Sequence, residues 1–379
     1  MSSIPAAEEI DEAKERAHFQ AVVNAFKYYK LCCLDRIHKS EKIISILPDL
    51  HQKRLEKYRS YLTKFKNCLD VNNSVVHLII KHVDTMFENV DHTIDPAETN
   101  GTEIGCNYNN CDISSHKKHK MQHDIEKVQT VIKNIVRDWS EAGAAEREQC
   151  YKPILDELEA RYPKQEFIDR SHIKVLVPGA GLGRLAWEIA ARGFSCQGNE
   201  FSLFMLFASN FLLNKCHEAN EYTVYPWVHQ YVNHMTSEHQ VTQATFPDIP
   251  PSSHQSHFSI TAGDFLKVYK TADDWDCVAS CFFIDCAPNV IEFIERIYDI
   301  LKPGGIWINL GPLLYHYSDM PNEISIEPPY DILKDIISDV GFEILKEKTG
   351  VKTKYAQNPN SMLQNEYNSV YFVCRKPSS

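Results

Sequence analysis

The chain has 379 residues, 43 % of them apolar, which suffices for one large or two moderate domains. Its formal net charge of -11 argues against nucleic acid as a partner, because a phosphate-binding face requires clustered positive charge. No run of about 18 apolar residues occurs and the first residues are rich in acidic side chains, so we expect neither a membrane span nor a signal peptide, and a protein of the cytoplasm, with the nucleus as a second location.

Residues 1–165 show no strand-like alternation and carry apolar side chains at helical spacing instead. Such stripes occur within 55–69 and 125–139, and an earlier one consists of Phe19, Val22, Val23 and Phe26. Pro153 stands where the first turn of a further helix favours proline. Because amphipathic helices need a partner surface, we expect residues 1–165 to form an all-helical domain. This domain docks on the rest of the chain or supports a homodimer.

A polar loop is expected at 91–120, a segment rich in Asn, Thr, Asp and His. Cysteines and histidines within or next to it are Cys106, Cys111, His116, His119 and His123. Their spacing fits no closed four-ligand zinc site. The 12 cysteines of the chain form no CxxC pair and suit a reducing compartment. We therefore expect no metal centre.

Three glycines at alternate positions form the most informative feature of the sequence. Residues 174–177 are a β-branched run that predicts a buried parallel strand. Gly179, Gly181 and Gly183 follow directly. Glycine permits positive φ and lets the backbone approach a ligand closely. The pattern favours a nucleotide-cofactor site over an ordinary tight turn.

An acid at the end of the next strand strengthens this prediction. A helix is expected from about Gly183 to Gly193, followed by a strand at 194–198. Glu200 then lies about 20 residues after the first glycine, where a carboxylate can accept hydrogen bonds from two ribose hydroxyls. The alternative is an ordinary surface glutamate.

The remaining elements complete an α/β domain over 166–379. An irregular, histidine-rich insertion at about 216–257 is either a lid or a surface elaboration. Strands are then predicted at 277–284, 306–310, 342–348 and 368–375, with helices at 289–301 and 330–340. No second glycine turn occurs, which disfavours a dinucleotide enzyme.

The order of these elements resembles a class I S-adenosylmethionine-dependent methyltransferase. Two segments carry the resemblance, namely the AGDF motif at 262–265 and the LKPGG motif at 301–305. The resemblance implies a seven-stranded Rossmann-like sheet with an antiparallel strand near one edge. Pro178 is a departure, since many such enzymes have an acid just before the first glycine.

Longer motifs resemble the carnosine N-methyltransferase family over about residues 120–379. They are VPGAGLGRLAWEIA at 177–190, GNEFSLFMLFASNFLLN at 198–214, SCFFIDCAPN at 280–289 and INLGPLLYHY at 308–317. Members of that family transfer the methyl group of S-adenosylmethionine to the imidazole of carnosine, a β-alanyl-histidine dipeptide, and produce anserine. The resemblance therefore implies S-adenosylmethionine as the cofactor and carnosine as the substrate.

The resemblance also assigns a cofactor role to eight positions. It places the glycine turn and the acid near the amino-acid and ribose portions, the AGDF motif near adenine, and NIVRDWS at 134–140 near the same cofactor. The residues are Asn134, Arg137, Gly179, Gly181, Glu200, Asp264, Phe265 and Cys281. Asn134 stands where the family pattern has Gln.

Substrate positions implied by the resemblance are Asp285, His316, Tyr355 and Tyr367, with Asp285 and His316 as the catalytic pair. The family's TAHN after the aspartate is CAPN here, at 286–289. A carboxylate that accepts the hydrogen of one imidazole nitrogen would leave the lone pair on the other and stabilise the developing imidazolium. Asp285 either does this or holds the ammonium group of the dipeptide.

Two alternative functions are compatible with the same motifs. One is a methyltransferase that acts on a histidine within a peptide or protein, for which the acidic surface would favour basic targets. The other is a catalytically silent binding module that keeps the fold. The presence of Glu200, Asp264, Asp285 and His316 together argues against a silent module.

Overall fold

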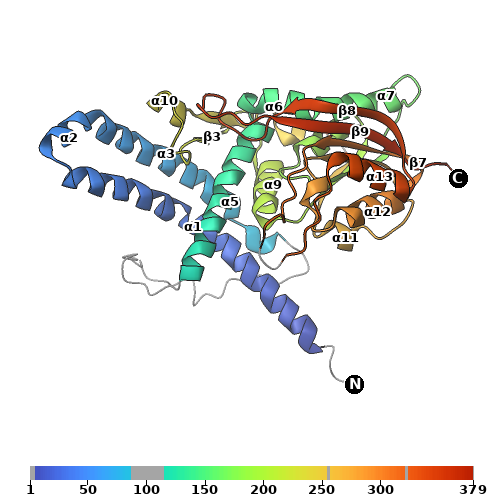
Figure 1. Cartoon of the computed structure of the whole chain (residues 1–379), viewed down its shortest axis with the longest axis horizontal. Coiled ribbons are helices and arrows are strands. Elements are labelled where there is room, and N and C mark those ends of the chain that lie inside the picture. Colours follow the sequence, from blue (N-terminus) through green and yellow to red (C-terminus); the bar gives the residue numbers. More distant parts are fainter. Residues whose placement is uncertain (1–4, 87–114, 254–256, 321–322, 379) are drawn as a thin grey trace. The chain divides into compact units, whose positions relative to one another are not determined.

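The computed structural model describes residues 5–86, 115–253, 257–320 and 323–378 (Figure 1). The chain divides into two compact units. The first contains the chain up to Lys133 together with Glu221–Thr245 and Asn360–Met362, and the second contains the rest. By this division the second unit begins at Asn134, while the helical part of the chain that precedes the first strand runs to Arg161. Among the described residues, no helix combines the length and apolarity needed to cross a bilayer.

The first unit is built mainly from long helices. These are α1 (Pro5–Ile46), α2 (Asp49–Arg54), α3 (Glu56–Ile80), the short η1 (Val83–Thr85) and the first part of α5 (Ser115–Trp139). The predicted stripe at 19–26 is buried, as are Leu62, Phe65 and Leu69 of α3. Residues 91–114 of the predicted loop, which include Cys106 and Cys111, lie outside the described residues. Residues 115–120 belong to α5, so this part of the predicted loop is helical.

The insertion predicted at 216–257 contributes to both units. Its middle part, Glu221–Thr245, belongs to the first unit and includes β3 (Tyr222–Val224) and α10 (Ser237–Gln240). β3 pairs with β4 (Ala244–Phe246) in a small two-stranded sheet. Neither strand was expected from the sequence. The mainly helical first unit therefore includes a segment, Glu221–Thr245, that begins about 90 residues after Lys133.

A seven-stranded sheet forms the centre of the second unit. Its order is β5-β2-β1-β6-β7-β9-β8. The strands are β1 (Lys174–Pro178), β2 (Ser195–Glu200), β5 (Phe258–Ala262), β6 (Trp275–Cys281), β7 (Leu301–Gly311), β8 (Glu343–Thr353) and β9 (Tyr367–Arg375). The first five are parallel, and β9 runs antiparallel to both β7 and β8.

Helices of the second unit supply residues to two buried clusters. After α5 come η2 (Glu141–Gly143), α6 (Ala144–Cys150), α7 (Lys152–Arg161), α8 (Arg184–Ala191), α9 (Leu203–Lys215), η3 (Pro251–Ser253), α11 (Phe265–Val268), η4 (Ile284–Cys286), α12 (Val290–Ile300) and α13 (Tyr330–Val340). One cluster joins α6, α7 and α8 to Val175 and Val177, and the other joins α12 and α13 to Leu176. Alternate strand residues therefore point to opposite faces of the sheet.

The structure corrects one strand that matters for the site. The strand predicted at 277–284 begins at Trp275 and ends at Cys281. Phe282 then adopts a φ of 54°, which takes the chain out of the sheet, and η4 follows. Asp285 therefore lies on a short helical turn and not at the strand end itself. The predicted helix at 330–340 is confirmed as α13.

Candidate active site

The glycine turn connects β1 to α8. Gly179, Gly181 and Gly183 have φ values of 64°, 54° and 82°, which residues with a side chain rarely adopt. A Cβ atom on Gly179 would come within 2.7 Å of the Phe283 ring, whereas a Cβ atom on Gly181 would meet nothing within 4 Å. The turn at Gly181 thus borders open space, where a ligand can approach the backbone closely.

Glu200 is tied to the same turn by backbone hydrogen bonds. Its Oε2 accepts from the N–H of Gly181 at 2.8 Å, and its Oε1 accepts from the N–H groups of Phe201 and Ser202, each at 2.8 Å. Burial raises the pKa of the Glu200 carboxyl, while these three N–H groups act in the opposite direction. The strand-end acid predicted from the sequence therefore lies against the glycine turn.

Asp264 and Phe265 follow the neighbouring strand. Ala262 of β5 is the register partner of Glu200, so Asp264 lies just beyond the same edge of the sheet. Its Oδ1 accepts from the N–H of Leu266 at 2.9 Å and caps α11. Phe265 is only 3 % exposed and packs edge-on against Phe283. Asp264 is accessible to a ligand, but the ring of Phe265 belongs to the core.

The end of α5 provides the polar wall of a cavity beside the glycine turn. Residues that line this cavity include Asn134, Arg137, Asp138, Tyr151, Gly179, Gly181, Met205, Cys281, Phe282 and Tyr355. Arg137 donates from Nη1 to the carboxylate of Asp138 at 2.8 Å and to the hydroxyl of Tyr151 at 2.6 Å. The buried Nδ2 of Asn134 has no hydrogen-bond partner among the described residues. A buried donor without a partner indicates an acceptor supplied by a ligand or water.

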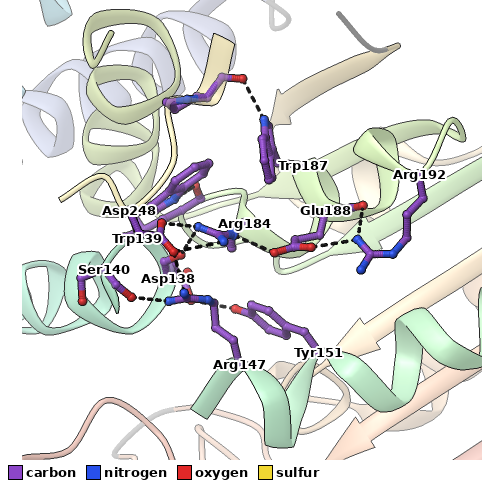
Figure 2. Close-up of polar contacts among 12 residues, drawn as sticks. Asp138, Trp139, Ser140, Arg147, Tyr151, Arg184, Trp187, Glu188, Arg192 and Asp248 are labelled. Carbon is purple, nitrogen blue, oxygen red and sulfur yellow. Dashed lines mark hydrogen bonds and ion pairs between the residues drawn. The ribbon is translucent and has the colours of Figure 1, made fainter. Parts of the chain in front are cut away.

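A buried ionic network fixes α5 to the glycine turn (Figure 2). Asp248 accepts from Nη2 of Arg147 and from Nη1 of Arg184, each at 2.6 Å. Arg184, the first residue of α8, also donates to the carbonyl of Asp138 at 3.1 Å. Trp139 donates from its indole nitrogen to the carbonyl of Leu182 at 3.0 Å. These bonds attach the last turn of α5 to the turn that precedes α8.

Aromatic rings gather around Phe282, just after β6. The rings of Tyr355 and Tyr367 lie with centroids 5.1 Å and 5.9 Å from that of Phe282. The guanidinium of Arg137 lies over the Tyr355 ring at 4.6 Å. Tyr355 and Phe282 thus both belong to this aromatic group and line the cavity beside the glycine turn. Tyr367 contacts the group but does not line that cavity.

Asp285 and His316 come together at the carboxyl ends of β6 and β7. The carbonyl of Asp285 accepts from the N–H of His316 at 3.0 Å, and its Oδ2 accepts from the N–H of Leu314 at 2.7 Å. The Oδ1 atom of Asp285 is buried and has no hydrogen-bond partner among the described residues. Burial raises the pKa of the Asp285 carboxyl, against the effects of the Leu314 N–H and of a positive charge on His316.

The structure thus brings ten of the twelve predicted residues together in two groups. The cofactor positions other than Asp264 and Phe265 surround the glycine turn, and the substrate positions surround Phe282 and Asp285. Sequence reasoning missed Asp138, Tyr151 and Phe282. Asp138 could have been found, because it lies next to Arg137 in the same motif. Tyr151 and Phe282 have no local signal.

The sheet order, the glycine turn after β1 and the acid after β2 define a class I S-adenosylmethionine-dependent methyltransferase. The family model for carnosine N-methyltransferase matches residues 114–378, and the chain belongs to this family. It is 48 % identical over 375 residues to carnosine N-methyltransferase unmet of Drosophila melanogaster, covering 97 % of this chain and 81 % of that relative. It is 45 % identical over 371 residues to carnosine N-methyltransferase of Mus musculus, covering 97 % of this chain and 88 % of that one.

Proposed function

We propose that the protein transfers a methyl group from S-adenosylmethionine to an imidazole nitrogen of carnosine and releases anserine and S-adenosylhomocysteine. Membership of the carnosine N-methyltransferase family supports the substrate class. The observation that carries the proposal is the unpaired, buried Oδ1 of Asp285 beside His316, on the turn that follows β6, the strand that pairs with β1. An imidazole N–H is a donor that this acceptor lacks.

The residues around the glycine turn suit S-adenosylmethionine, which supplies an electrophilic methyl group when bound. Glu200 would accept from the ribose hydroxyls with the lone pairs that its backbone partners leave free. Asn134 and Arg137 would bind the amino-acid portion. Asp264 would meet the adenine amino group, while Phe265 would support Asp264 through the core. Cys281, at the end of β6, lines the same cavity.

Asp285 would orient the methyl acceptor. A neutral imidazole has one N–H and one lone pair, and methyl transfer requires the lone pair to face the departing sulfur in line. A carboxylate bonded to the N–H selects that tautomer and stabilises the positive charge that develops on the ring. Since Asp285 is only 1 % exposed, this charge stabilisation is weakly screened by water.

Tyr355 and Tyr367 would form a wall of the substrate pocket together with Phe282. Their rings lie around Phe282, three residues before Asp285, so an imidazole bonded to Asp285 would lie against an aromatic surface. His316 is exposed and adjacent to Asp285, where it can donate to the carboxylate of the dipeptide. The proposal thereby gives each of the four substrate positions a separate contact.

Two measurements test the activity. Mass spectrometry of carnosine incubated with the protein and S-adenosylmethionine should show the gain of one methyl group, and NMR should place it on the ring. No gain on carnosine, with methylation of histidine in added peptides, would favour the peptide substrate instead.

A variant tests the role of Asp285. Asp285→Asn should reduce kcat at least about 100-fold, because an amide cannot stabilise the imidazolium as a carboxylate does. Binding of S-adenosylhomocysteine should stay close to that of the unsubstituted protein. Asp335→Asn, at an exposed position of α13, is the matched control and should leave both quantities unchanged. Full turnover in Asp285→Asn would refute the assignment.

We also propose that the protein forms a homodimer through the first unit. Apolar side chains on α1 and α2 are exposed, among them Ile43, Ile46 and Leu50. Clustered exposed apolar side chains often mark an interface. Light scattering of the protein and of an Ile43→Glu, Ile46→Glu variant would test this, with a dimer converted to a monomer as the expected result.

A further inference from the structure

Three potential metal ligands of different chemistry meet in the substrate group of residues. Within the described parts of the chain, one ligand atom each of Asp285, Cys286 and His316 lies within 4.8 Å of the other two. Backbone hydrogen bonds from Leu314 and His316 to Asp285 hold the two loops together. The three side chains therefore converge on one point from two segments that are 30 residues apart.

The donors suit zinc better than magnesium or calcium. Zinc is bound by imidazole, thiolate and carboxylate, and often by three protein ligands with a fourth position left open. Magnesium and calcium require several oxygen ligands, and this group offers oxygen from only one side chain. At usual zinc bond lengths, tetrahedral ligand atoms lie about 3.3 to 3.8 Å apart. His316 is exposed and Cys286 is half-buried, so small side-chain rotations can close the gap.

An independent observation points to a ligand at the same place. The Asp285 side chain is 1 % exposed, and its Oδ1 has no hydrogen-bond partner among the described residues. A buried carboxylate oxygen without a partner is costly and is relieved by a cation or a donor. In the proposed reaction the substrate imidazole is that donor, which means that a cation and the substrate would compete for one atom.

We propose that Asp285, Cys286 and His316 bind zinc or a similar thiophilic divalent cation, and that this cation inhibits methyl transfer by blocking the substrate imidazole. The inhibition rests on the proposed function, whereas the metal binding does not. Cys286 is essential to the inference, because its thiolate is the ligand that favours zinc over magnesium and calcium.

The charges of the site agree with a divalent cation. A bound cation displaces the thiol proton of Cys286, as it does for other cysteine ligands. One carboxylate and one thiolate then neutralise the two positive charges of the ion, and the imidazole binds through a neutral nitrogen.

Direct metal binding is the first test. The full chain, carrying Cys106→Ser and Cys111→Ser to remove two thiols of the 91–120 segment, is titrated with Co²⁺ as a spectroscopic substitute for Zn²⁺. We expect one equivalent to give a thiolate-to-metal charge-transfer band. Cys286→Thr should abolish the band and weaken Zn²⁺ binding at least about tenfold, since even loss of a residue that only supports a ligand costs 10- to 100-fold. His316→Ala, at an exposed position, should weaken binding similarly without disturbing the fold.

Inhibition is the second test, with free Zn²⁺ fixed by a metal buffer because carnosine itself chelates metals. Methyl transfer should fall as Zn²⁺ rises and recover with a chelator, and Mg²⁺ should have no effect. Each variant is compared with its own metal-free rate, and Cys286→Thr should need at least about tenfold more Zn²⁺ for half-inhibition. Cys68→Ser, in the first unit, is the control thiol and should behave like the parent chain. Absence of the charge-transfer band, or equal Zn²⁺ affinity in Cys286→Thr, would overturn the metal site. A band with no methylation of carnosine would instead contradict the proposed function alone.

Discussion

Individual residues of the site depend on a few directional hydrogen bonds. Glu200 illustrates this, because each of its carboxylate oxygens accepts from backbone N–H groups of fixed position. Those bonds orient the carboxylate toward the cofactor cleft and offset part of the cost of burying it. Asp285 differs in that Leu314 secures only one of its oxygens, which leaves the other for a ligand.

Replacement of Glu200 should therefore affect the cofactor directly. Glu200→Gln exchanges one acceptor oxygen for an amide donor, which repels either the Gly181 N–H or the N–H groups of Phe201 and Ser202. We expect binding of S-adenosylhomocysteine, measured by calorimetry, to weaken by about 1.5 to 3 kcal/mol. Glu166→Gln, at an exposed position, serves as the control. Unchanged affinity in Glu200→Gln would mean that the carboxylate does not contact the cofactor.

At the scale of elements, the site depends on how the last turn of α5 and the start of α8 are held. The glycine turn between β1 and α8 is a ligand-facing turn, and Leu182, Arg184 and Asp248 connect it to α5. A conformational change in the turn would therefore alter the positions of Asn134 and Arg137 as well. Backbone strain and buried charge are the two features of these elements that can be tested separately.

A comparison of two glycine variants separates the effect of backbone strain from that of ligand contact. Gly181 and Gly350 have φ values of 54° and 69°, and a Cβ atom at either would meet nothing within 4 Å. Gly181→Ala and Gly350→Ala should each lower the free energy of unfolding by about 1 to 2 kcal/mol. Only Gly181→Ala should also weaken cofactor binding, by at least about tenfold, or 1.4 kcal/mol, because its methyl group enters the cleft. Equal cofactor affinity in the two variants would contradict the placement of the cleft.

The buried ionic network should contribute to stability far more than exposed pairs do. Asp248→Asn leaves Arg147 and Arg184 close together with side chains only 10 % and 6 % exposed, and neither can lose its charge. We expect a loss of about 3 kcal/mol in the free energy of unfolding. Asp156→Asn, which removes an exposed pair with Lys152, should cost less than about 1 kcal/mol. A similar small loss in both variants would show that water reaches the network.

At the scale of the whole molecule, the two units have separate polar cores. The first contains a buried group in which the hydroxyl of Tyr29 bonds to Nε2 of His229 at 2.6 Å and accepts from Asn72 at 3.2 Å. Burial, with a smaller effect of Lys133, lowers the pKa of His229 from 6.5 to about 3. The second unit holds the ionic network and the site. A fall in pH should thus lower the stability of the first unit through His229.

The sign of this pH effect follows from the lowered pKa. In the unfolded chain His229 binds a proton below about pH 6.5, whereas in the folded unit it stays neutral down to about pH 3. Stability therefore falls as the pH falls through that window. From pH 7 to 5 the free energy of unfolding of the first unit should fall by about 2 kcal/mol. Amide hydrogen exchange in α1 and α3 would measure this change. His229→Gln should remove most of this dependence, and His51→Gln, at an exposed position, should not. A wild-type stability that does not change from pH 7 to 5 would disagree with the buried neutral histidine.

The parts of the molecule that sequence predicts well are those specified by neighbouring residues. The buried strand at 174–178, the alternate glycines and the acid of Glu200 are local patterns, and the structure places them as expected. The pairing of β3 with β4 and the approach of Asp248 to Arg147 connect segments that are far apart in the chain. Such contacts leave no periodic signal. Phe282 was missed for a related reason, since a positive φ at a non-glycine residue is imposed by its surroundings.

The place of β9 in the sheet has a consequence for how the protein is made. β9 lies between β7 and β8, which do not pair with each other (Figure 1). While the chain is on the ribosome, β8 therefore emerges before its pairing strand, and it cannot join the sheet until residues 367–375 are made. A polypeptide released before Tyr367 would expose the open sides of β7 and β8, which invite pairing with other chains. Premature stop codons even this late in the message should therefore yield aggregates and not a shortened enzyme.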